Sequence, residues 1–294
     1  MELKGRTAVV TGAGAGIGRA IARALAGAGC NVGAADIEED AARRVVDELA
    51  GTGIVARAYR VDVTLEAEVV ALADRTWRDF GSVEILVNNA GVLPRPGPLL
   101  GSSQTDYEWV FAVNVGGMLN GMRVFGNRFA DSASRCWIVN TGSEQCLGVP
   151  IPNGGLYTAS KHALLGLTDV LRRELPPNVG ISILCPGFVE TTLWRSAERR
   201  PGQFGGPGQT DPAGATLMKL GMPADEVAEC VLKGLRDETF YMLSHPHVVD
   251  LARERWNEVE VAFKAQAPRR EGDTRYAMPN VLERLSQAAS ARRG

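Results

Sequence analysis

A tyrosine and a lysine one helical turn apart are the residues of this sequence best suited to proton transfer. Tyr157 and Lys161 enclose the run YTASK, and a spacing of four residues places them on one face of a helix. A nearby cation favours the phenolate, so the lysine is expected to lower the pKa of the tyrosine and make it a general acid or base. An amphipathic helix face without chemistry is the alternative interpretation.

A serine upstream of this pair adds a contact to the substrate. Ser143 follows the apolar run of residues 136–141, which is typical of a buried strand. Parallel sheets bind their ligands at the carboxyl ends of such strands. From there the serine hydroxyl can hydrogen-bond the substrate oxygen that Tyr157 protonates or deprotonates. The three side chains predict acid–base chemistry at a hydroxyl or carbonyl oxygen.

A glycine-rich loop near the start of the chain predicts a dinucleotide site. Residues 11–18 read TGAGAGIG, directly after a predicted strand at 7–11 and at the start of a predicted helix at 17–28. Glycines let the backbone turn tightly and approach a pyrophosphate, whose charge is met by the helix N-terminus. Such loops also occur as plain tight turns, and the order of strand, loop, helix and strand favours the cofactor interpretation.

An acid at the end of the next predicted strand indicates which cofactor is bound. Asp36 lies eighteen residues after Gly18, close to the ~20 expected for a carboxylate that binds the adenosine ribose. It accepts hydrogen bonds from the ribose hydroxyls and repels a 2′-phosphate, and neither Ala15 nor Ile37 supplies a cation for that phosphate. The sequence therefore predicts NAD rather than NADP. The alternative is an exposed aspartate that caps the loop before Asp40.

The elements that must position these residues alternate between short apolar runs and helical patterns. The apolar runs predict strands at residues 7–11, 31–36, 56–61, 85–89, 136–141, 181–185 and 240–243. The helical patterns occupy residues 17–28, 40–50, 65–80, 104–129, 156–175 and 248–264. Continuously apolar strands suit a sheet covered on both faces, and their alternation with helices indicates parallel crossovers. The predicted fold class is α/β: a single-domain Rossmann fold, with a doubly wound parallel sheet of about seven strands and helices on both faces.

Two segments depart from this alternation. Residues 191–223 contain six glycines and four prolines, and a structureless stretch of this length is typical of a functional lid or of disorder. Residues 265–294 are polar and lean basic, with a helical pattern at 279–289. We expect an NAD-binding and catalytic domain over residues 1–264, with a substrate lid at 191–223. The tail at 265–294 is expected either to fray or to dock on a neighbouring subunit.

Composition excludes several classes of function. The chain has 294 residues, of which 45% are hydrophobic and 22% charged, and 32 basic against 34 acidic residues give a net charge of −2. A chain with this charge balance lacks the excess of basic residues that binds nucleic acid or an anionic membrane surface. No apolar run approaches the ~20 residues of a membrane-spanning helix, and the first residues lack the pattern of a signal peptide. A cytoplasmic protein is therefore expected.

The cysteines and histidines predict neither disulfides nor a metal site. Five cysteines at wide, irregular spacing suit reduced thiols. His245 and His247 lack a third ligand nearby in sequence, so a structural role is favoured. Cys146, three residues after Ser143, is expected to pack or to line the pocket rather than to react. Glu144 is expected to face solvent, with a contact to the substrate as the alternative.

Taken together, these motifs resemble those of the short-chain dehydrogenase/reductase family. The matching features stand in the family's order between residues 7 and 191. They are TGAGAGIG at 11–18, Asp36, Asp62-Val63, Asn88-Asn89-Ala90-Gly91, Asn114, Ser143, YTASK at 157–161, Pro186-Gly187 and Thr191. The resemblance implies an NAD-dependent alcohol dehydrogenase, an oxidoreductase that moves a hydride between nicotinamide and a secondary alcohol or its ketone.

The resemblance also implies roles for individual residues. Asn114 is expected to bend its helix and to hold a water in a proton relay that runs from Tyr157 through the ribose and Lys161. The implied catalytic set is Asn114, Ser143, Tyr157 and Lys161. The implied cofactor-binding residues are Gly12, Gly14, Ala15, Gly16, Ile17, Gly18, Asp36, Ile37, Asp62, Val63, Asn89, Ala90, Gly91, Tyr157, Lys161, Pro186, Gly187, Val189 and Thr191. A homotetramer or homodimer is implied as well, packed through the helices at 104–129 and 156–175, with close approach at Gly116, Gly117, Gly121 and Gly126.

The segments expected to shape the substrate pocket are mostly apolar. They are residues 93–100, 144–155 and the lid at 191–223. The expected pocket contacts are Ser143, Gln145, Cys146, Leu147, Tyr157, Leu193 and Trp194, with Leu93, Leu99, Val149, Ile151, Leu156, Phe204 and Met218 as further apolar candidates. This lining predicts a bulky, apolar secondary alcohol of cyclic, aryl or terpenoid type.

Three other functions share this scaffold. An NADPH-dependent carbonyl reductase is disfavoured by Asp36 and by the lack of a neighbouring arginine. A non-catalytic, NAD-sensing protein would be expected to lose the serine, tyrosine or lysine, and all three are present. An epimerase or lyase would keep its cofactor tightly bound and turn over without net reduction.

Overall fold

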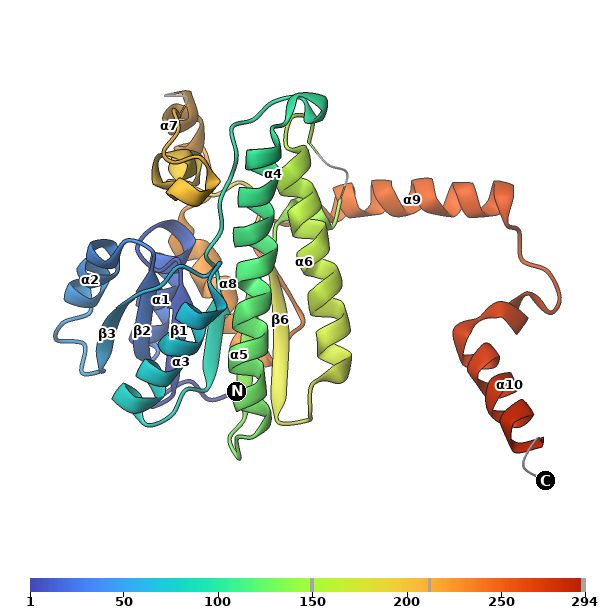
Figure 1. Ribbon diagram of the computed structural model, residues 1–294, viewed down its shortest axis with the longest axis horizontal. Helices are drawn as coiled ribbons and strands as arrows, with labels where there is room; N and C mark the ends of the chain where they lie inside the picture. Colours follow the sequence, from blue (N-terminus) through green and yellow to red (C-terminus); the bar gives the residue numbers. More distant parts are fainter. Residues whose placement is uncertain (149–150, 211–212, 292–294) are drawn as a thin grey trace.

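The computed structural model describes residues 1–148, 151–210 and 213–291 and has a parallel sheet at its centre (Figure 1). The strands are β1 (Thr7–Thr11), β2 (Asn31–Asp36), β3 (Ala56–Arg60), β4 (Ile85–Asn88), β5 (Cys136–Thr141), β6 (Val179–Cys185) and β7 (Tyr241–Leu243). They pair in the order β3-β2-β1-β4-β5-β6-β7, and every neighbouring pair is parallel. The predicted doubly wound sheet is confirmed.

Helices cover both faces of the sheet (Figure 1). One face carries α1 (Gly16–Gly27), α2 (Glu39–Glu48) and α8 (Ala224–Asp237), and the other carries α3 (Glu66–Phe80), α5 (Met118–Ala130) and α6 (Gly155–Glu174). Successive strand residues point to opposite faces, so Val10 packs in the core beneath α1 and α8 while Val9 packs beneath α3 and α5. Because helices cover both faces of the sheet, every residue of β1 is buried. This explains why the sequence of this strand does not alternate between polar and apolar residues.

The strand order reverses beside β1, and this places the candidate site. β1 pairs with β2 on one side and with β4 on the other, so the connections that follow β1 and β4 run to opposite faces of the sheet. A crevice then opens at the carboxyl ends of the strands, which is where sheets of this kind bind ligands. The glycine loop, Asp36, Asn89, Ser143 and Pro186 all stand at or just beyond the ends of strands at this edge.

The predicted helix over residues 104–129 is confirmed as one rod that runs from α4 (Gln104–Phe111) into α5 (Figure 1). Two of its glycines pack closely against other parts of the same chain. A Cβ at Gly121 would lie 2.1 Å from Oδ1 of Asn88, and Gly117 packs almost as tightly on the segment after β3. At these two glycines the helix therefore approaches other parts of its own chain closely. This corrects the expectation that Gly117 and Gly121 allow close approach of a helix from another subunit.

The described residues of the range 191–223, called the lid segment below, are folded rather than structureless. They contain short 3-10 turns, the longest at Leu193–Arg199, and the helix α7 (Ala213–Met218). A parallel bridge joins Met222, near the end of the segment, to Val189, just before its start. The expectation of a structureless stretch is wrong, because these turns give the backbone local hydrogen-bond partners despite the many glycines and prolines.

The chain after β7 forms an arm that leaves the domain. α9 (Val248–Gln266) begins at the body, where Nε of Arg255 donates to the main-chain O of Gly148 over 2.9 Å, and its far half projects outward (Figure 1). α10 (Met278–Ala291) follows and stands apart from the sheet and its helices. Both helices predicted for this part of the chain are confirmed. No helix in the described part of the chain is long and apolar enough to cross a membrane.

Candidate active site

A cavity of about 480 Å³ opens at the carboxyl edge of the sheet. It extends from the glycine loop after β1 to the first turns of α6, and the lid segment forms part of its wall. The predicted site residues that line it are Gly12, Ala15, Gly16, Ile17, Asp36, Ile37, Asp62, Val63, Asn89, Ala90, Gly91, Ser143, Gln145, Tyr157, Lys161, Pro186, Gly187, Val189, Thr191 and Leu193. The structure thus brings most of the predicted residues together in one cavity.

The glycine loop is tight because two backbone segments nearly touch. Gly12 has a φ of +63°, and a Cβ there would lie 2.9 Å from Cα of Ala90. Gly14 and Gly18, both predicted to bind the cofactor, do not line the cavity. A Cβ at Gly18 would lie 2.1 Å from the main-chain O of Gly12, and one at Gly14 would lie 2.5 Å from Cβ of Ala41 on α2. Gly18 therefore lets α1 pack closely under the loop, and Gly14 lets the loop pack against α2.

The carboxylate of Asp36 is held in place by the backbone. Its Oδ2 accepts from the N–H of Gly14 over 2.8 Å, and its Oδ1 accepts from the N–H of Glu38 over 3.0 Å. Both contacts orient the acid at the end of β2, where it lines the cavity. The aspartate therefore caps the loop before Asp40, as the alternative interpretation held, but it is half-buried and also lines the cavity.

An arginine that the sequence analysis missed reaches the same end of the cavity. Arg199, in the lid segment, lines the cavity, and its Nη1 lies 3.2 Å from Oε2 of Glu38. The two residues are separated by 161 positions in the chain, so no local pattern could have paired them. Glu38 balances the charge of this arginine beside the predicted adenosine site.

Tyr157 and Lys161 lie one turn apart on α6, at the wall of the cavity. Nζ of Lys161 donates to the main-chain O of Thr141, the last residue of β5, over 2.7 Å, and it lies 5.4 Å from the centroid of the Tyr157 ring. Ser143 follows Thr141 by two residues and lines the same cavity. The three side chains predicted for acid–base chemistry therefore meet where β5 ends against α6.

Desolvation dominates the pKa of both groups. It raises the pKa of Tyr157 to about 12, against an opposing effect of the Ser143 hydroxyl, and it lowers the pKa of Lys161 to about 8. The expectation that the lysine lowers the pKa of the tyrosine is wrong for the free protein. Lys161 lies over the face of the ring and donates to Thr141, so the loss of solvent around the phenolate outweighs its attraction.

The buried lysine predicts a pH-dependent contribution to stability. Between the folded pKa of about 8 and the ordinary value of 10.5, the unfolded chain binds more protons at Lys161 than the folded protein does. Stability therefore rises with pH across this window, and the charged amine costs the fold roughly 3 kcal/mol at pH 7. In Lys161→Met this contribution is absent. The melting temperature of the wild type relative to that variant should rise by roughly 5 °C or more from pH 8 to 10.5 and stay flat below pH 8.

Scanning fluorimetry of the two proteins across this pH range measures the difference. Lys219→Met serves as the control, because Lys219 is exposed on the lid segment, and its melting curve should follow the wild type at every pH. A constant gap between the wild type and Lys161→Met from pH 7 to 10.5 would contradict a lysine with a lowered pKa.

Asn114 lies in a π-helical segment, Ala112–Gly117, that interrupts the rod of α4 and α5, and π segments are frequent at functional sites. Its side chain is buried. Oδ1 accepts from the N–H of Val92 over 2.8 Å, and Nδ2 donates to O of Val92 over 3.0 Å and to Oγ of Ser160 over 3.1 Å. The helix is distorted here as predicted. Because the amide is engaged by protein, Asn114 positions Val92 and Ser160 beside the site, and its relay water stays a prediction.

The substrate end of the cavity is mostly apolar. Leu93, Ile151, Leu193 and Met218 line it as predicted. Trp109, Val113 and Leu217 also line it and were missed, because the first two are ordinary core positions of a long helix in the sequence. Leu99, Leu156 and Phe204 are not part of this lining, and Val149 lies outside the described residues.

Three of the predicted pocket contacts lie elsewhere, which corrects the expected pocket. Cys146 and Leu147 turn away from the cavity and pack in a small core with Cys185, and Sγ of Cys146 lies 3.7 Å from Sγ of Cys185. Trp194 lies at a separate hollow beside α1. The 3-10 turn at Glu144–Cys146 causes the first difference, because it leaves Ser143, Glu144 and Gln145 at the cavity and turns the next two residues into the core.

Two residues near the site take orientations that the sequence did not reveal. Glu144 turns inward, with a side chain that is 13% exposed and lines the cavity, so the expectation that it faces solvent is wrong. His245 is buried, and its Nδ1 accepts from the N–H of Gly187 over 3.0 Å while Nε2 faces O of Phe188 at 3.1 Å. His245 therefore holds the loop after β6, the predicted structural role. In the described part of the chain, no three His, Cys, Asp or Glu side chains gather as metal ligands.

The chain is similar to dehydrogenases over most of its length. A family model described as short chain dehydrogenase matches residues 6–202. The chain is 34% identical over 253 residues to the 2,3-dihydro-2,3-dihydroxybenzoate dehydrogenase of Bacillus subtilis, which covers 84% of this chain and 95% of that one. It is 34% identical over 261 residues to the 1-deoxy-11-beta-hydroxypentalenate dehydrogenase of Streptomyces avermitilis, covering 88% and 92% of the two chains.

A solved structure shares the fold closely. A short chain dehydrogenase/reductase from Burkholderia phymatum, in complex with NAD, superposes with a TM-score of 0.84 at 37% sequence identity. The superposition covers 89% of this chain and 96% of that one. The similarity therefore extends well beyond the short motifs to the whole sheet and its helices.

Proposed function

The chain belongs to the short-chain dehydrogenase family, and we propose that it is an NAD-dependent enzyme that interconverts a secondary alcohol and its ketone. The observation that supports this most is that Ser143, Tyr157 and Lys161 line the same cavity as the glycine loop and Asp36. Groups suited to proton transfer at a substrate oxygen thus stand beside a site shaped for a dinucleotide.

The dinucleotide end of the cavity fits a nicotinamide cofactor. α1 begins at Gly16 without a side-chain cap and without an acid in its first turn, so its N–H groups can bind a pyrophosphate. Asp36 would bind the adenosine ribose, and Lys161 the nicotinamide ribose, while Pro186 and Thr191 would flank the nicotinamide. When bound, the nicotinamide supplies the carbon that accepts or gives the hydride.

Tyr157 is the proposed proton carrier. In alcohol oxidation its oxygen takes the proton of the substrate hydroxyl, and in ketone reduction it returns a proton to the carbonyl oxygen. The raised pKa of about 12 in the free protein keeps the phenol protonated at neutral pH, which suits the reducing direction. Ser143 holds the same substrate oxygen, and Lys161 stabilises the negative charge that develops on the phenol during oxidation.

NAD is the proposed cofactor rather than NADP. The carboxylate of Asp36 is held at the cavity by Gly14 and Glu38, where it would repel a 2′-phosphate. Arg199 is the cation that would favour NADP, and its pairing with Glu38 at 3.2 Å balances its charge. The NAD in the Burkholderia phymatum structure supports the same choice.

The proposed substrate is bulky and apolar, of cyclic, aryl or terpenoid type. Leu93, Trp109, Leu193 and Leu217 line the substrate end, and apolar walls of this kind hold carbon skeletons while a few polar groups orient them. The two relatives named above are dehydrogenases of 2,3-dihydro-2,3-dihydroxybenzoate and 1-deoxy-11-beta-hydroxypentalenate, which supports a substrate of similar size.

The direct test is reduction of NAD or NADP by a panel of secondary alcohols. Cyclohexanol, 1-phenylethanol and borneol should reduce NAD faster than 2-propanol or lactate does, as followed by absorbance of the reduced nicotinamide. Faster reduction of NADP than of NAD would contradict the cofactor assignment. Binding of NAD by calorimetry without turnover of any alcohol or ketone would favour a non-catalytic, NAD-sensing protein.

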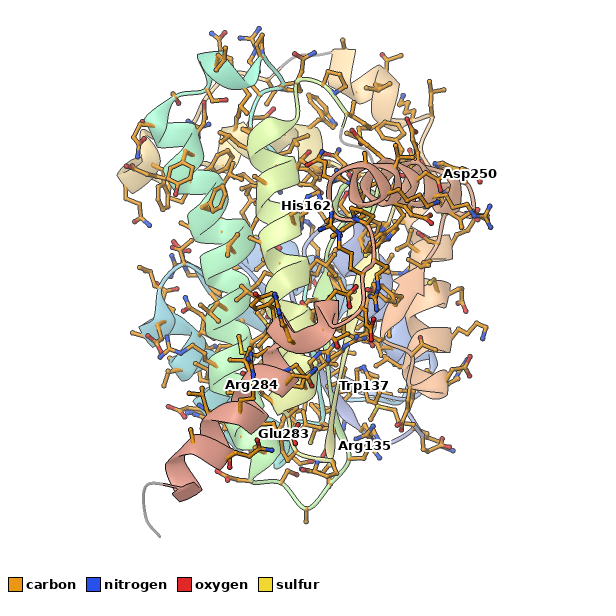
Figure 2. All side chains as sticks on the ribbon, turned by 90° about the vertical axis from the view of Figure 1, so that its right-hand side faces the viewer. Arg135, Trp137, His162, Asp250, Glu283 and Arg284 are labelled. Carbon is orange, nitrogen blue, oxygen red and sulfur yellow. The ribbon has the colours of Figure 1, made fainter. Side chains whose placement is uncertain are left out.

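We also propose a homo-oligomer, a homotetramer or homodimer, in which the arm docks on a second copy. Figure 2 looks onto the arm from outside, with Asp250 on α9 and Glu283 and Arg284 on α10. The arm exposes large apolar side chains, among them Trp256, Phe263, Tyr276, Leu282 and Leu285. Apolar surface of this extent is typical of a contact with protein. Sedimentation velocity of the full chain should show an oligomer, and a monomer at micromolar concentration would contradict the proposal.

A further inference from the structure

We propose that two consecutive arginines, Arg199 and Arg200, hold the lid segment across the cavity at one fixed and one releasable point. Arg200 fixes the segment to the wall of the substrate pocket. The ion pair of Arg199 with Glu38, called the latch below, holds it beside the dinucleotide end and opens when the dinucleotide leaves. This inference rests on the proposed dehydrogenase function and adds to it the residues that position the lid segment and control release of the cofactor.

The two arginines reach opposite sides of the sheet from adjacent positions in the chain. They stand at the end of the 3-10 turn Leu193–Arg199. Arg199 lines the cavity and pairs with Glu38, which directly precedes α2 on one face of the sheet. Nη2 of Arg200 pairs with Oδ1 of Asp106 on α4, which continues into α5 on the other face. A segment that is held at both points therefore bridges the cavity between them.

The end held by Arg200 is largely enclosed. The side chains of Arg200 and Asp106 are 15% and 27% exposed, and Cζ of Arg200 lies 4.3 Å from the centroid of the Trp109 ring. Oγ of Ser103 donates to Oδ2 of Asp106 over 2.8 Å, which holds this carboxylate at the start of α4. Ion pairs and cation–π contacts are both stronger where water is excluded. Because Trp109 is buried and lines the cavity, Arg200 positions part of the substrate pocket.

Two further contacts attach the lid segment on the same side. The N–H of Leu93 donates to Oγ of Ser196, a buried residue of the segment, over 3.2 Å. Phe204 packs against the small core that contains Trp109. The segment therefore has several attachments beside the substrate pocket, and the loss of one leaves the others in place.

The latch is open to solvent. Nη1 of Arg199 lies 3.2 Å from Oε2 of Glu38, and the two side chains are 34% and 50% exposed. Arg195, on the same turn, pairs with Glu198 instead. Exposed ion pairs are weak and are screened by salt, whereas enclosed pairs are screened much less. Of the two points that hold the segment, the latch is therefore the one that opens more readily.

The rate at which NADH dissociates tests the latch. In Glu38→Gln, NADH should leave about threefold faster than from the wild type at low salt, because an exposed ion pair that holds the segment is lost. Between about 50 and 500 mM salt the wild type should approach the rate of the variant, since salt screens the same ion pair. Stopped-flow fluorescence after mixing the NADH complex with excess NAD measures both rates.

The charge of the cofactor alone predicts the opposite result. NADH is an anion, so the loss of a negative charge near its site, or a contact of the freed Arg199 with its phosphates, should slow its release. Release from Glu38→Gln at the wild-type rate or more slowly would therefore overturn the latch. Glu39→Gln is the matched control. Glu39 pairs with Arg43 within α2 at 2.8 Å, so the same change of charge one residue away should not speed release.

Steady-state kinetics test the fixed point. Arg200→Met removes the cation over Trp109 and should raise KM for 1-phenylethanol by about 10-fold while kcat stays within about twofold, because the pocket wall binds the substrate alike in the ground and transition states. Arg200→Lys keeps a cation at this position and should recover part of the loss. Arg195→Met, an exposed change on the same turn, should leave this KM as in the wild type.

Two results would overturn the role of Arg200. One is an unchanged KM for the alcohol in Arg200→Met. The other is a loss of kcat of the same size in Arg200→Met and Arg200→Lys without a change in KM, which would mean that the substitutions disturb the reacting centre rather than the pocket wall.

Failure of this inference is distinct from failure of the proposed function. If the protein binds no NADH and no secondary alcohol reduces NAD, the proposed function is wrong. If alcohols reduce NAD, and Glu38→Gln and Arg200→Met match the wild type in NADH release and in KM for the alcohol, the dehydrogenase stands. The two arginines then do not hold the lid segment.

Discussion

Replacing Tyr157 with phenylalanine should lower kcat for alcohol oxidation by about a thousandfold, within the range that positioned acid–base groups contribute. The change removes one oxygen atom and leaves the ring on α6. The ring therefore keeps its contact with Lys161, whose Nζ lies 5.4 Å from the ring centroid. The loss should fall on kcat and on kcat/KM together, because proton transfer occurs in the transition state rather than in the binding of the substrate. Calorimetry should show NAD binding within about threefold of the wild type.

Tyr107→Phe is the matched control for this experiment. Tyr107 is 45% exposed on α4 and lies outside the cavity, so the same removal of a phenolic oxygen should leave kcat unchanged. A loss of less than tenfold in Tyr157→Phe would mean that another group, or water, carries the proton. A parallel loss of NAD affinity would instead point to a disturbed site and would leave the assignment of the proton carrier without support.

Replacing Asp36 with asparagine should lower kcat/KM for NAD by about 10–100-fold, the value of one or two hydrogen bonds to a charged group. The carboxylate accepts from the N–H groups of Gly14 and Glu38 at 2.8 and 3.0 Å, and an asparagine can place an oxygen toward only one of them. Its NH₂ group would then face a backbone donor. The variant should also narrow the preference for NAD over NADP, because the charge that repels a 2′-phosphate is gone.

Asp47→Asn controls for a general loss of negative charge, since Asp47 is an exposed residue of α2, and its kinetics should match the wild type. The measurement is kcat/KM for both cofactors at saturating alcohol. Unchanged discrimination between NAD and NADP in Asp36→Asn would assign cofactor choice to Arg199 and Glu38 at the same end of the cavity. A variant that reduces NADP faster than NAD would show that Asp36 alone opposed the phosphate.

The fold could be predicted from the sequence because its signals are local. Each buried strand is a short apolar run, and residues 11–18 combine a strand end, a tight turn and a helix start within eight positions. Tyr157 and Lys161 are paired by helix geometry alone. A parallel sheet then collects the strand ends at one edge, so residues far apart in the chain converge without any need to know their side-chain contacts.

The parts that could not be predicted depend on tertiary contacts. Arg199 meets Glu38 only because the lid segment folds back toward the end of β2. Whether Glu144 or Cys146 faces the cavity depends on a short turn whose direction no periodicity records. The pKa of Tyr157 follows from how much solvent the surrounding protein removes, and a spacing of four residues contains no information about that.

The lid segment touches both ends of the cavity, and this has a kinetic consequence. Arg199 stands at the adenosine end, beside Glu38, while Leu193 and Met218 stand at the substrate end. A ligand that contacts the segment at one end can therefore change the affinity for a ligand at the other, and this coupling is reciprocal. Steady-state rates should then give a KM for the alcohol that changes with the concentration of the dinucleotide.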